Sequence, residues 1–244
     1  MQNRYVADIG DYVKLAILRQ LACGRRLGIA WWLFPDEHHN SDGGHREYLD
    51  RPNEWRRFDR ELFDALLKIA KAKDWDVCAL ERAGILSNAV FASDPVPCEA
   101  RPFPRRPKER GGWLERVKIK LKDCDLIFLD PDNGIASENL RLRQRRAGKS
   151  VTIEEIKILQ ENNRAMVIYH HQTRFQGGHI AELHHLATHL RKYGLHVSGA
   201  LRAKPWSPRL FLILNGDKEL HNRAKSIAKD WGNHISWISL SEFS

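Results

Sequence analysis

The chain has only four cysteines among its 244 residues, and no two of them form a Cys-x-x-Cys pair. This spacing argues against a zinc knuckle and against a disulfide framework. No apolar stretch approaches the roughly 20 residues needed to span a bilayer. The first residues also lack the charged-then-apolar layout of a signal peptide. Together these absences predict a cytoplasmic protein.

Two common phosphate-binding signatures are missing as well. The sequence contains neither a Gly-x-Gly-x-x-Gly dinucleotide fingerprint nor a Gly-x-x-x-x-Gly-Lys-Ser/Thr loop. It also lacks the His-Glu-x-x-His spacing of zinc proteases. His185 and His189 are spaced to share one helical face, but they are more simply the polar flank of a surface helix. The sequence therefore assigns no metal site.

Positive charge is what the chain has in excess. Lysine and arginine total 40 against 31 acidic residues, a formal net charge of +9. Such an excess favours a polyanionic partner, most commonly nucleic acid, DNA or RNA. The charge is concentrated in two basic loops predicted at about residues 98–112 and 139–150, although a solvated face is the plain alternative for each run. The candidate phosphate-binding residues are Arg105, Arg106, Arg141, Arg143, Arg145, Arg146 and Arg174.

Hydrophobic periodicity predicts alternating strands and helices. Strands are expected at 27–34, 76–80, 126–129, 165–169, 196–201 and 209–214, with an edge strand at 235–240. Helices are expected at 9–22, 54–73, 112–122, 178–193 and 217–230, with a further helix beginning at the capping box of Thr152 and Glu155. This order predicts α/β architecture, namely a doubly wound, Rossmann-like, mostly parallel sheet with helices on both faces. With no internal repeat and no convincing linker, residues 1–244 are predicted to form a single domain.

The most informative junction lies where the run 126–129 meets Asp130, Pro131, Asp132, Asn133 and Gly134. The proline fixes φ and removes an N–H, so the strand must stop there. The Asn-Gly pair then allows a tight turn with positive φ. Open α/β sheets bind ligands at the carboxyl ends of their strands. Asp130, Asp132 and Asn133 are therefore candidate catalytic residues, and a simple capping turn is the alternative.

Three predicted loops follow predicted strands, at residues 36–45, 130–134 and 170–174. In a parallel sheet such loops converge on one edge and line one crevice. The first loop carries two glycines that allow close backbone approach to a ligand. A single ligand site between these loops is the expectation.

The strand order, the acidic turn and the late pair of strands around 202–214 together resemble the class I S-adenosylmethionine-dependent methyltransferases. Members that methylate amines carry Asp/Asn-Pro-Pro-aromatic after the fourth strand, where an acidic or amide side chain and a backbone carbonyl hold the target amine. Asp130 and Pro131 match the first half of that motif. Asp132 and Asn133 depart from the second half, which removes the aromatic ring that would stack on a base.

A second resemblance concerns the N-terminal segment. Residues 8–14, Asp-Ile-Gly-Asp-Tyr-Val-Lys, are similar to the Asn-x-Ala-Asp-x-x-Lys-His segment of the large-subunit ribosomal RNA adenine-N6 methyltransferases, where it helps to enclose the cofactor. A plain amphipathic helix is the alternative. The resemblance implies S-adenosylmethionine as cofactor, with contacts from Asp11, Lys14, Asp36 and Glu81.

Three functions remain open at this stage. The first is an S-adenosylmethionine-dependent methyltransferase acting on an exocyclic amine of a nucleic-acid base. The second is a metal-dependent nuclease or phosphoesterase, with ligands from Asp36, Asp130, Asp132 and one of His170 and His171. The third is a nucleic-acid-binding protein without catalytic activity, in which the acidic turn is only structural.

Overall fold

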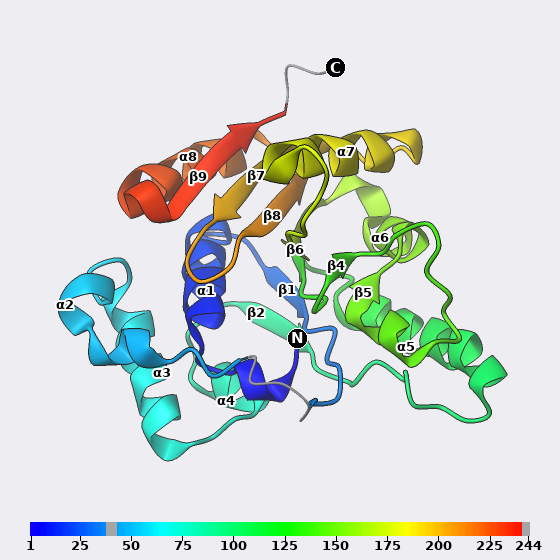
Figure 1. The fold of residues 1–244 in the computed structure, drawn as a ribbon, viewed down its shortest axis with the longest axis horizontal. Helices are drawn as coiled ribbons and strands as arrows, with labels where there is room; N and C mark the ends of the chain where they lie inside the picture. Colours follow the sequence, from blue (N-terminus) through cyan, green and yellow to red (C-terminus); the bar gives the residue numbers. More distant parts are fainter. Residues whose placement is uncertain (38–42, 241–244) are drawn as a thin grey trace.

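The computed structural model describes residues 1–37 and 43–240, and in it a seven-stranded sheet has the order β2-β1-β3-β6-β8-β7-β9 (Figure 1). Its strands are β1 Leu27–Ala30, β2 Ala89–Ala92, β3 Leu126–Leu129, β6 Ala165–His171, β7 Val197–Ala203, β8 Arg209–Leu214 and β9 Ile235–Ser239. Strands β2, β1, β3 and β6 pair in parallel, whereas β8 is antiparallel to both β6 and β7, and β9 is antiparallel to β7. The Rossmann-like α/β prediction is confirmed.

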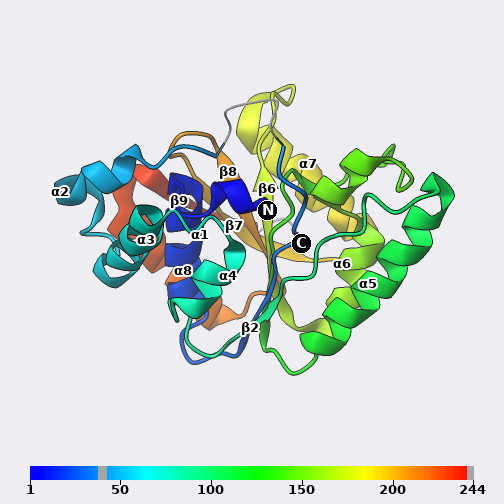
Figure 2. The same cartoon turned by 90° about the horizontal axis from the view of Figure 1, so that it is seen from below.

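Helices cover both faces of this sheet. They are α1 Ile9–Leu21, α2 Pro52–Trp55, α3 Arg60–Ala72, α4 Val77–Arg82, α5 Arg106–Lys120, α6 Ile153–Leu159, α7 Gly178–Lys192 and α8 Lys218–Trp231. The view from below shows α1, α3, α4 and α8 on one side of the sheet and α5, α6 and α7 on the other (Figure 2). Among the described residues, no helix is both long and apolar enough to cross a membrane.

Alternation along the strands divides the core into two layers. In β3, Leu126 and Phe128 pack in the layer beneath α1, α3 and α8, whereas Ile127 and Leu129 pack in the layer beneath α5, α6 and α7. Successive side chains of a strand point to opposite faces, so a strand covered on both sides must be apolar throughout. The unbroken apolar run before Asp130 thus marks β3 as a central strand.

One predicted strand is wrong. Residues 76–80 do not form a strand, because helix α4 begins at Val77 and runs through Glu81 to Arg82. Asp76 caps this helix, since its side chain accepts a hydrogen bond from the Cys78 N–H at 2.8 Å. The strand at this point of the fold is β2, which pairs with β1. A short apolar run fits either a helix or a strand, so periodicity alone could not decide between them.

Other predicted boundaries also shift. The predicted basic loop at 98–112 is helical from Arg106 onward, because Pro107 is tolerated in the first turn of an α-helix. The predicted helix at 54–73 divides into α2 and α3, with Asp59 capping the second. The predicted strand at 27–34 ends at Ala30, and Trp32 has a positive φ of 49°.

Candidate functional site

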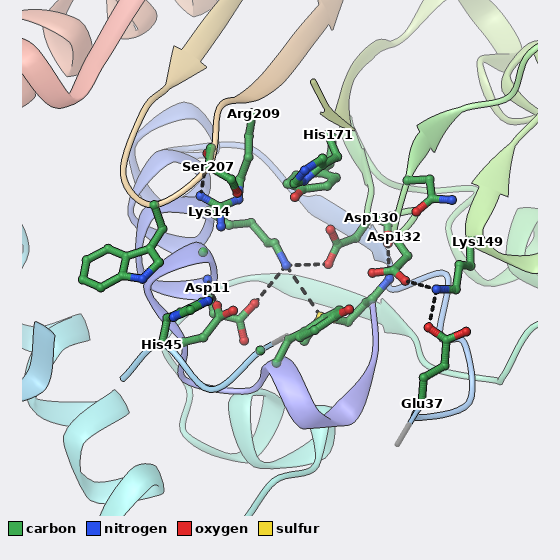
Figure 3. A pocket seen from close by; sticks show the side chains of 18 residues that line it. Asp11, Lys14, Glu37, His45, Asp130, Asp132, Lys149, His171, Ser207 and Arg209 are labelled. Carbon is green, nitrogen blue, oxygen red and sulfur yellow. Dashed lines mark hydrogen bonds and ion pairs between the residues drawn. The ribbon is translucent and has the colours of Figure 1, made fainter. Parts of the chain in front are cut away.

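A cavity of about 380 Å³ lies at the carboxyl ends of β1, β3 and β6 (Figure 3). The loops after these strands contribute Glu37, Asp130, Asp132 and Asn133 to its wall, and β6 itself contributes His171. The predicted convergence of loops on one sheet edge is therefore what the fold produces. Residues 38–42 of the first predicted loop lie outside the described residues.

The start of α1 forms the floor of this cavity. Asp8 caps the helix by accepting a hydrogen bond from the Asp11 N–H at 2.8 Å. One turn later, Lys14 is only 5% exposed, and its ammonium contacts Asp11 Oδ1 at 2.9 Å and Asp130 Oδ2 at 2.7 Å. A buried lysine thus connects the acidic turn after β3 to the first helix. The two carboxylates raise the pKa of Lys14 although burial alone would lower it, so this ammonium stays charged.

The turn after β3 presents hydrogen-bond acceptors to the cavity. Asp130 is 2% exposed, and its backbone oxygen accepts a hydrogen bond from the Met1 amine at 2.8 Å. Asp132 Oδ2 accepts from Gln2 Nε2 at 2.7 Å and lies 3.4 Å from Lys149 Nζ. Burial would raise the pKa of Asp132, but these positive and donating neighbours outweigh burial and lower it. Asp132 is therefore an ionised carboxylate at neutral pH.

Gly134 ends the turn with a φ of 95°, and its backbone lies close against the His170 ring. A Cβ at this position would lie 2.3 Å from His170 Nδ1. That nitrogen accepts a hydrogen bond from the Ile135 N–H at 3.1 Å, so the ring proton resides on Nε2, which lies 3.6 Å from Glu182. His170 is thus a buried support behind the turn and not a group at the cavity wall.

The β7–β8 hairpin forms the opposite rim. Because β7 runs parallel to β6, its connection to β8 returns at the same sheet edge, and Trp206, Ser207 and Arg209 line the cavity there. The sequence did not predict these residues as part of the site. Lys149 was not predicted either, since it appears only as a member of the basic loop at 139–150. A signal existed for Arg209, since it begins a strand directly after a turn.

The residues expected to contact a cofactor divide into two groups. Asp11 and Lys14 are among the described lining residues, whereas Asp36 and Glu81 are not. The Asp36 carboxylate accepts from the Arg4 N–H at 3.1 Å, and the Glu81 carboxylate accepts from Trp31 Nε1 at 2.9 Å and from the Ser93 hydroxyl. Glu81 lies on α4 and not at the end of a strand, which corrects the reason for choosing it.

The arginines expected to contact phosphate also divide. Arg106 is only 7% exposed and donates to the backbone oxygens of Ala100 and Arg143, so its guanidinium is directed into the protein and not toward a ligand. Arg145 contacts Glu99 at 3.0 Å. The remaining candidates, Arg105, Arg141, Arg143, Arg146 and Arg174, are exposed.

The lining carries charges of both signs, with carboxylates in excess. Five carboxylates line the cavity against three lysine or arginine side chains and Met1, whose amine contacts the Asp130 backbone oxygen. The acidic members are Asp8, Asp11, Glu37, Asp130 and Asp132, and the basic members are Lys14, Lys149 and Arg209. Within the described ranges, no group of three or more His, Cys, Asp or Glu side chains is arranged to hold a metal ion. In comparisons with protein-family models, curated proteins and solved structures, nothing matched this chain.

Proposed function

We propose that this chain is an S-adenosylmethionine-dependent methyltransferase that acts on an amine of a nucleic acid. The observation that carries the proposal is an acidic cavity at the carboxyl edge of the sheet, beside a basic segment that contributes Lys149 to its wall. An acidic cavity suits a sulfonium and an amine, whereas exposed arginines suit phosphates. The two electrostatic environments match the two parts of such a reaction.

The donor set of the cavity fits the proposed cofactor. S-adenosylmethionine carries an ammonium, a carboxylate, a sulfonium and an adenine ring, and so requires acidic, basic and aromatic neighbours. The cavity offers carboxylates for the cationic groups, the Lys149 ammonium for a carboxylate, and Tyr5 and Tyr169 for a ring. The bound cofactor would supply a methyl group on a positively charged sulfur. The Glu81 contact implied by the resemblance is not part of this proposal.

The turn after β3 would hold the amine. Asp132 is an ionised acceptor, and the Asn133 side chain offers an amide oxygen. Acceptors at these positions orient the amine so that its lone pair forms the new N–C bond as the S–C bond breaks, and the nitrogen then releases a proton to solvent. Lys14 holds Asp130 in place behind this turn, so Asp130 acts as a positioning residue.

Isothermal titration with S-adenosylmethionine, followed by a methyl-incorporation assay on total RNA and on DNA, tests the proposal. Asp132→Asn should lower methyl incorporation about 10- to 100-fold, in line with the roughly 1.5–3 kcal/mol of a hydrogen bond to a charged group. Asp123→Asn is the matched control, because Asp123 is an exposed carboxylate in the turn before β3. Absence of cofactor binding by the wild-type chain at millimolar concentration would refute the proposal.

The nucleic-acid partner is supported by the segment between residues 141 and 149. Its end at Lys149 lines the acidic cavity, and its beginning at Arg141 and Arg143 lines a second cavity of about 720 Å³ together with the exposed ring of Phe103. Alternating arginines and an exposed aromatic ring suit phosphates and bases. A polynucleotide following this segment would extend from the second cavity to the first.

Salt dependence tests this partner. Replacing Arg141, Arg143 and Arg146 with glutamine should flatten the slope of log affinity against log salt for a single-stranded oligonucleotide by about 2 units. The reason is that binding releases fewer counterions when fewer phosphates are neutralised. Replacing the exposed Lys68, Lys71 and Lys73 of the α3 region on the other side of the sheet removes the same charge and should leave the slope unchanged. Equal slopes for the two triple variants would contradict the proposed surface.

A further inference from the structure

Trp206 is an exposed indole at the mouth of the acidic cavity. It lies in the connection between β7 and β8, lines the cavity, and is 46% exposed. Four other tryptophans, Trp31, Trp32, Trp113 and Trp231, are among the largest fully buried side chains. Large aromatic rings contribute most when buried, so a half-exposed indole beside a ligand cavity requires a reason.

The backbone at this position is strained. Trp206 has a φ of 63°, in the left-handed region that costs a residue with a Cβ about 1–2 kcal/mol. Glycine would adopt this conformation without that cost. Strained conformations of this kind cluster at ligand sites, so a bulky residue in one at a cavity wall points to a role for its ring.

Arg209 fixes the strained connection in place. This residue is only 7% exposed, and its Nη1 donates to the backbone oxygens of Pro205 at 2.7 Å and Ser207 at 3.1 Å, on either side of Trp206. The Ser207 N–H also donates to the Pro205 oxygen at 2.8 Å. The indole is therefore carried on a braced backbone, which lowers the ordering cost when a ligand binds against it.

The neighbours of the ring are polar or cationic. The His45 ring lies 5.6 Å from the indole centroid at a tilt of 43°, and the Arg51 guanidinium lies 5.9 Å from it. His45 also lines the cavity, so the two neighbouring rings both belong to its wall. A flat ligand ring entering here would meet an aromatic surface before it reached the carboxylates.

We propose that Trp206 is a stacking platform for the planar aromatic ring of a ligand that enters this cavity. A nucleobase has the required shape and π surface, and stacking on an aromatic side chain tolerates any base. The turn after β3 has Asp132 and Asn133 where the resembled motif has an aromatic residue, and the Trp206 ring would take over that stacking role. The inference deepens the proposed function and rests on it for the amine that the ring carries. Two rings share this chemistry, the substrate base and the adenine of the cofactor.

Binding of two probes to three variants tests the platform. The probes are adenosine 5′-monophosphate and S-adenosylhomocysteine, and the variants are Trp206→Ala, Trp206→Phe and, as a control, Tyr193→Ala, which removes an exposed ring just beyond the end of α7. Trp206→Ala should weaken binding of at least one probe roughly 5- to 150-fold, the range for loss of one stacked base. Trp206→Phe should stay within about threefold of wild type, and so should Tyr193→Ala.

Fluorescence adds a readout that a purely structural role would not change. Binding should quench wild-type emission, and Trp206→Phe should lose that quenching while retaining affinity. Weakened binding of adenosine 5′-monophosphate alone assigns the platform to the substrate ring, whereas weakened binding of S-adenosylhomocysteine alone assigns it to the cofactor adenine. Both results support stacking.

The inference is overturned if Trp206→Ala binds both probes as wild type does, or if the wild-type chain binds neither probe at 10 mM, a concentration on the order of the weakest useful affinities. It is also overturned if Phe and Ala weaken binding equally. If the wild-type chain transfers no methyl group but probe affinity still depends on a ring at position 206, the platform stands and the methyltransferase proposal fails.

Discussion

Replacing Lys14 with methionine should measure how much its ion pairs contribute to the stability of the protein. Methionine preserves most of the apolar stem and its volume, so the change removes mainly the ammonium between Asp11 and Asp130. Both carboxylates are at most 2% exposed and would then face each other without a shared cation. Removing one partner of a buried ion pair costs about 3–5 kcal/mol, because an uncompensated charge remains.

The loss should depend on pH in a defined direction. In the wild-type chain the pKa of Lys14 is raised, so its contribution is complete below the unfolded pKa near 10.5 and constant between pH 5 and 8. Burial raises the pKa of Asp11 although the Lys14 ammonium acts to lower it, so loss of the ammonium should raise the pKa of Asp11 further. A raised carboxyl pKa means that stability is lost as pH increases. The variant should therefore lose more stability at pH 8 than at pH 5.

Urea denaturation at both pH values measures this effect. Lys118→Met is the control, since Lys118 forms a partly exposed ion pair with Glu161 at 3.2 Å and should lose at most about 1 kcal/mol. Adding Asp11→Asn to Lys14→Met should restore part of the stability by removing one unpaired charge. A loss below about 1 kcal/mol at pH 8, or equal losses at the two pH values, would refute the reasoning from burial.

Three further predictions concern groups around the same edge of the sheet. Burial would raise the pKa of Glu182, but the nearby His170 ring and the hydrogen bonds from Thr173 lower it to about 2. Glu182→Gln should therefore cost roughly 2–3 kcal/mol at pH 7 and progressively less as pH falls from 5 to 2 in denaturation experiments. Burial and the neighbouring Asp11 carboxylate raise the pKa of Asp8 to about 7. The folded state is therefore destabilised as pH rises and Asp8 loses its proton. Asp8→Asn should increase the free energy of unfolding by about 1 kcal/mol or more at pH 8 and by little at pH 4. Gly134→Ala should lower the free energy of unfolding by at least about 2 kcal/mol, because the new Cβ would collide with His170. Gly24→Ala is the control: Gly24 also has a positive φ but open space around it, so calorimetry should show a loss of only about 1 kcal/mol.

Much of the fold could be predicted from the sequence because its signals are local. A proline directly after an apolar run marks where β3 ends, and alternating strand and helix periods specify the α/β class. The turn at Asp130 could be assigned to the carboxyl edge for the same reason. These inferences require only neighbouring residues and the general rules of parallel sheets.

The rest depends on partners far apart in the chain. Arg110 lies in a run that looks like a solvated basic loop, yet it is 4% exposed and contacts Glu155 at 2.5 and 2.9 Å, 45 residues later. Glu81 looks like a strand end because a short apolar run precedes it. Trp206 lies in what looks like a plain connection, and only the contacts of Arg209 reveal its braced position. Such pairings carry no local signature.

The small sheet formed by β4, Gly134–Ile135, and β5, Ser150–Val151, closes the basic segment at both ends. The Asn133 N–H donates to the Lys149 oxygen at 2.8 Å, and the Ala136 N–H donates to the Val151 oxygen at 2.8 Å. Lengthening a loop whose ends are already fastened costs little, about 0.6 kcal/mol for each doubling. Residues 137–142, which are exposed or half-buried, can therefore change in length and sequence while the turn after β3 keeps its geometry, whereas the buried Ala147 and Gly148 cannot.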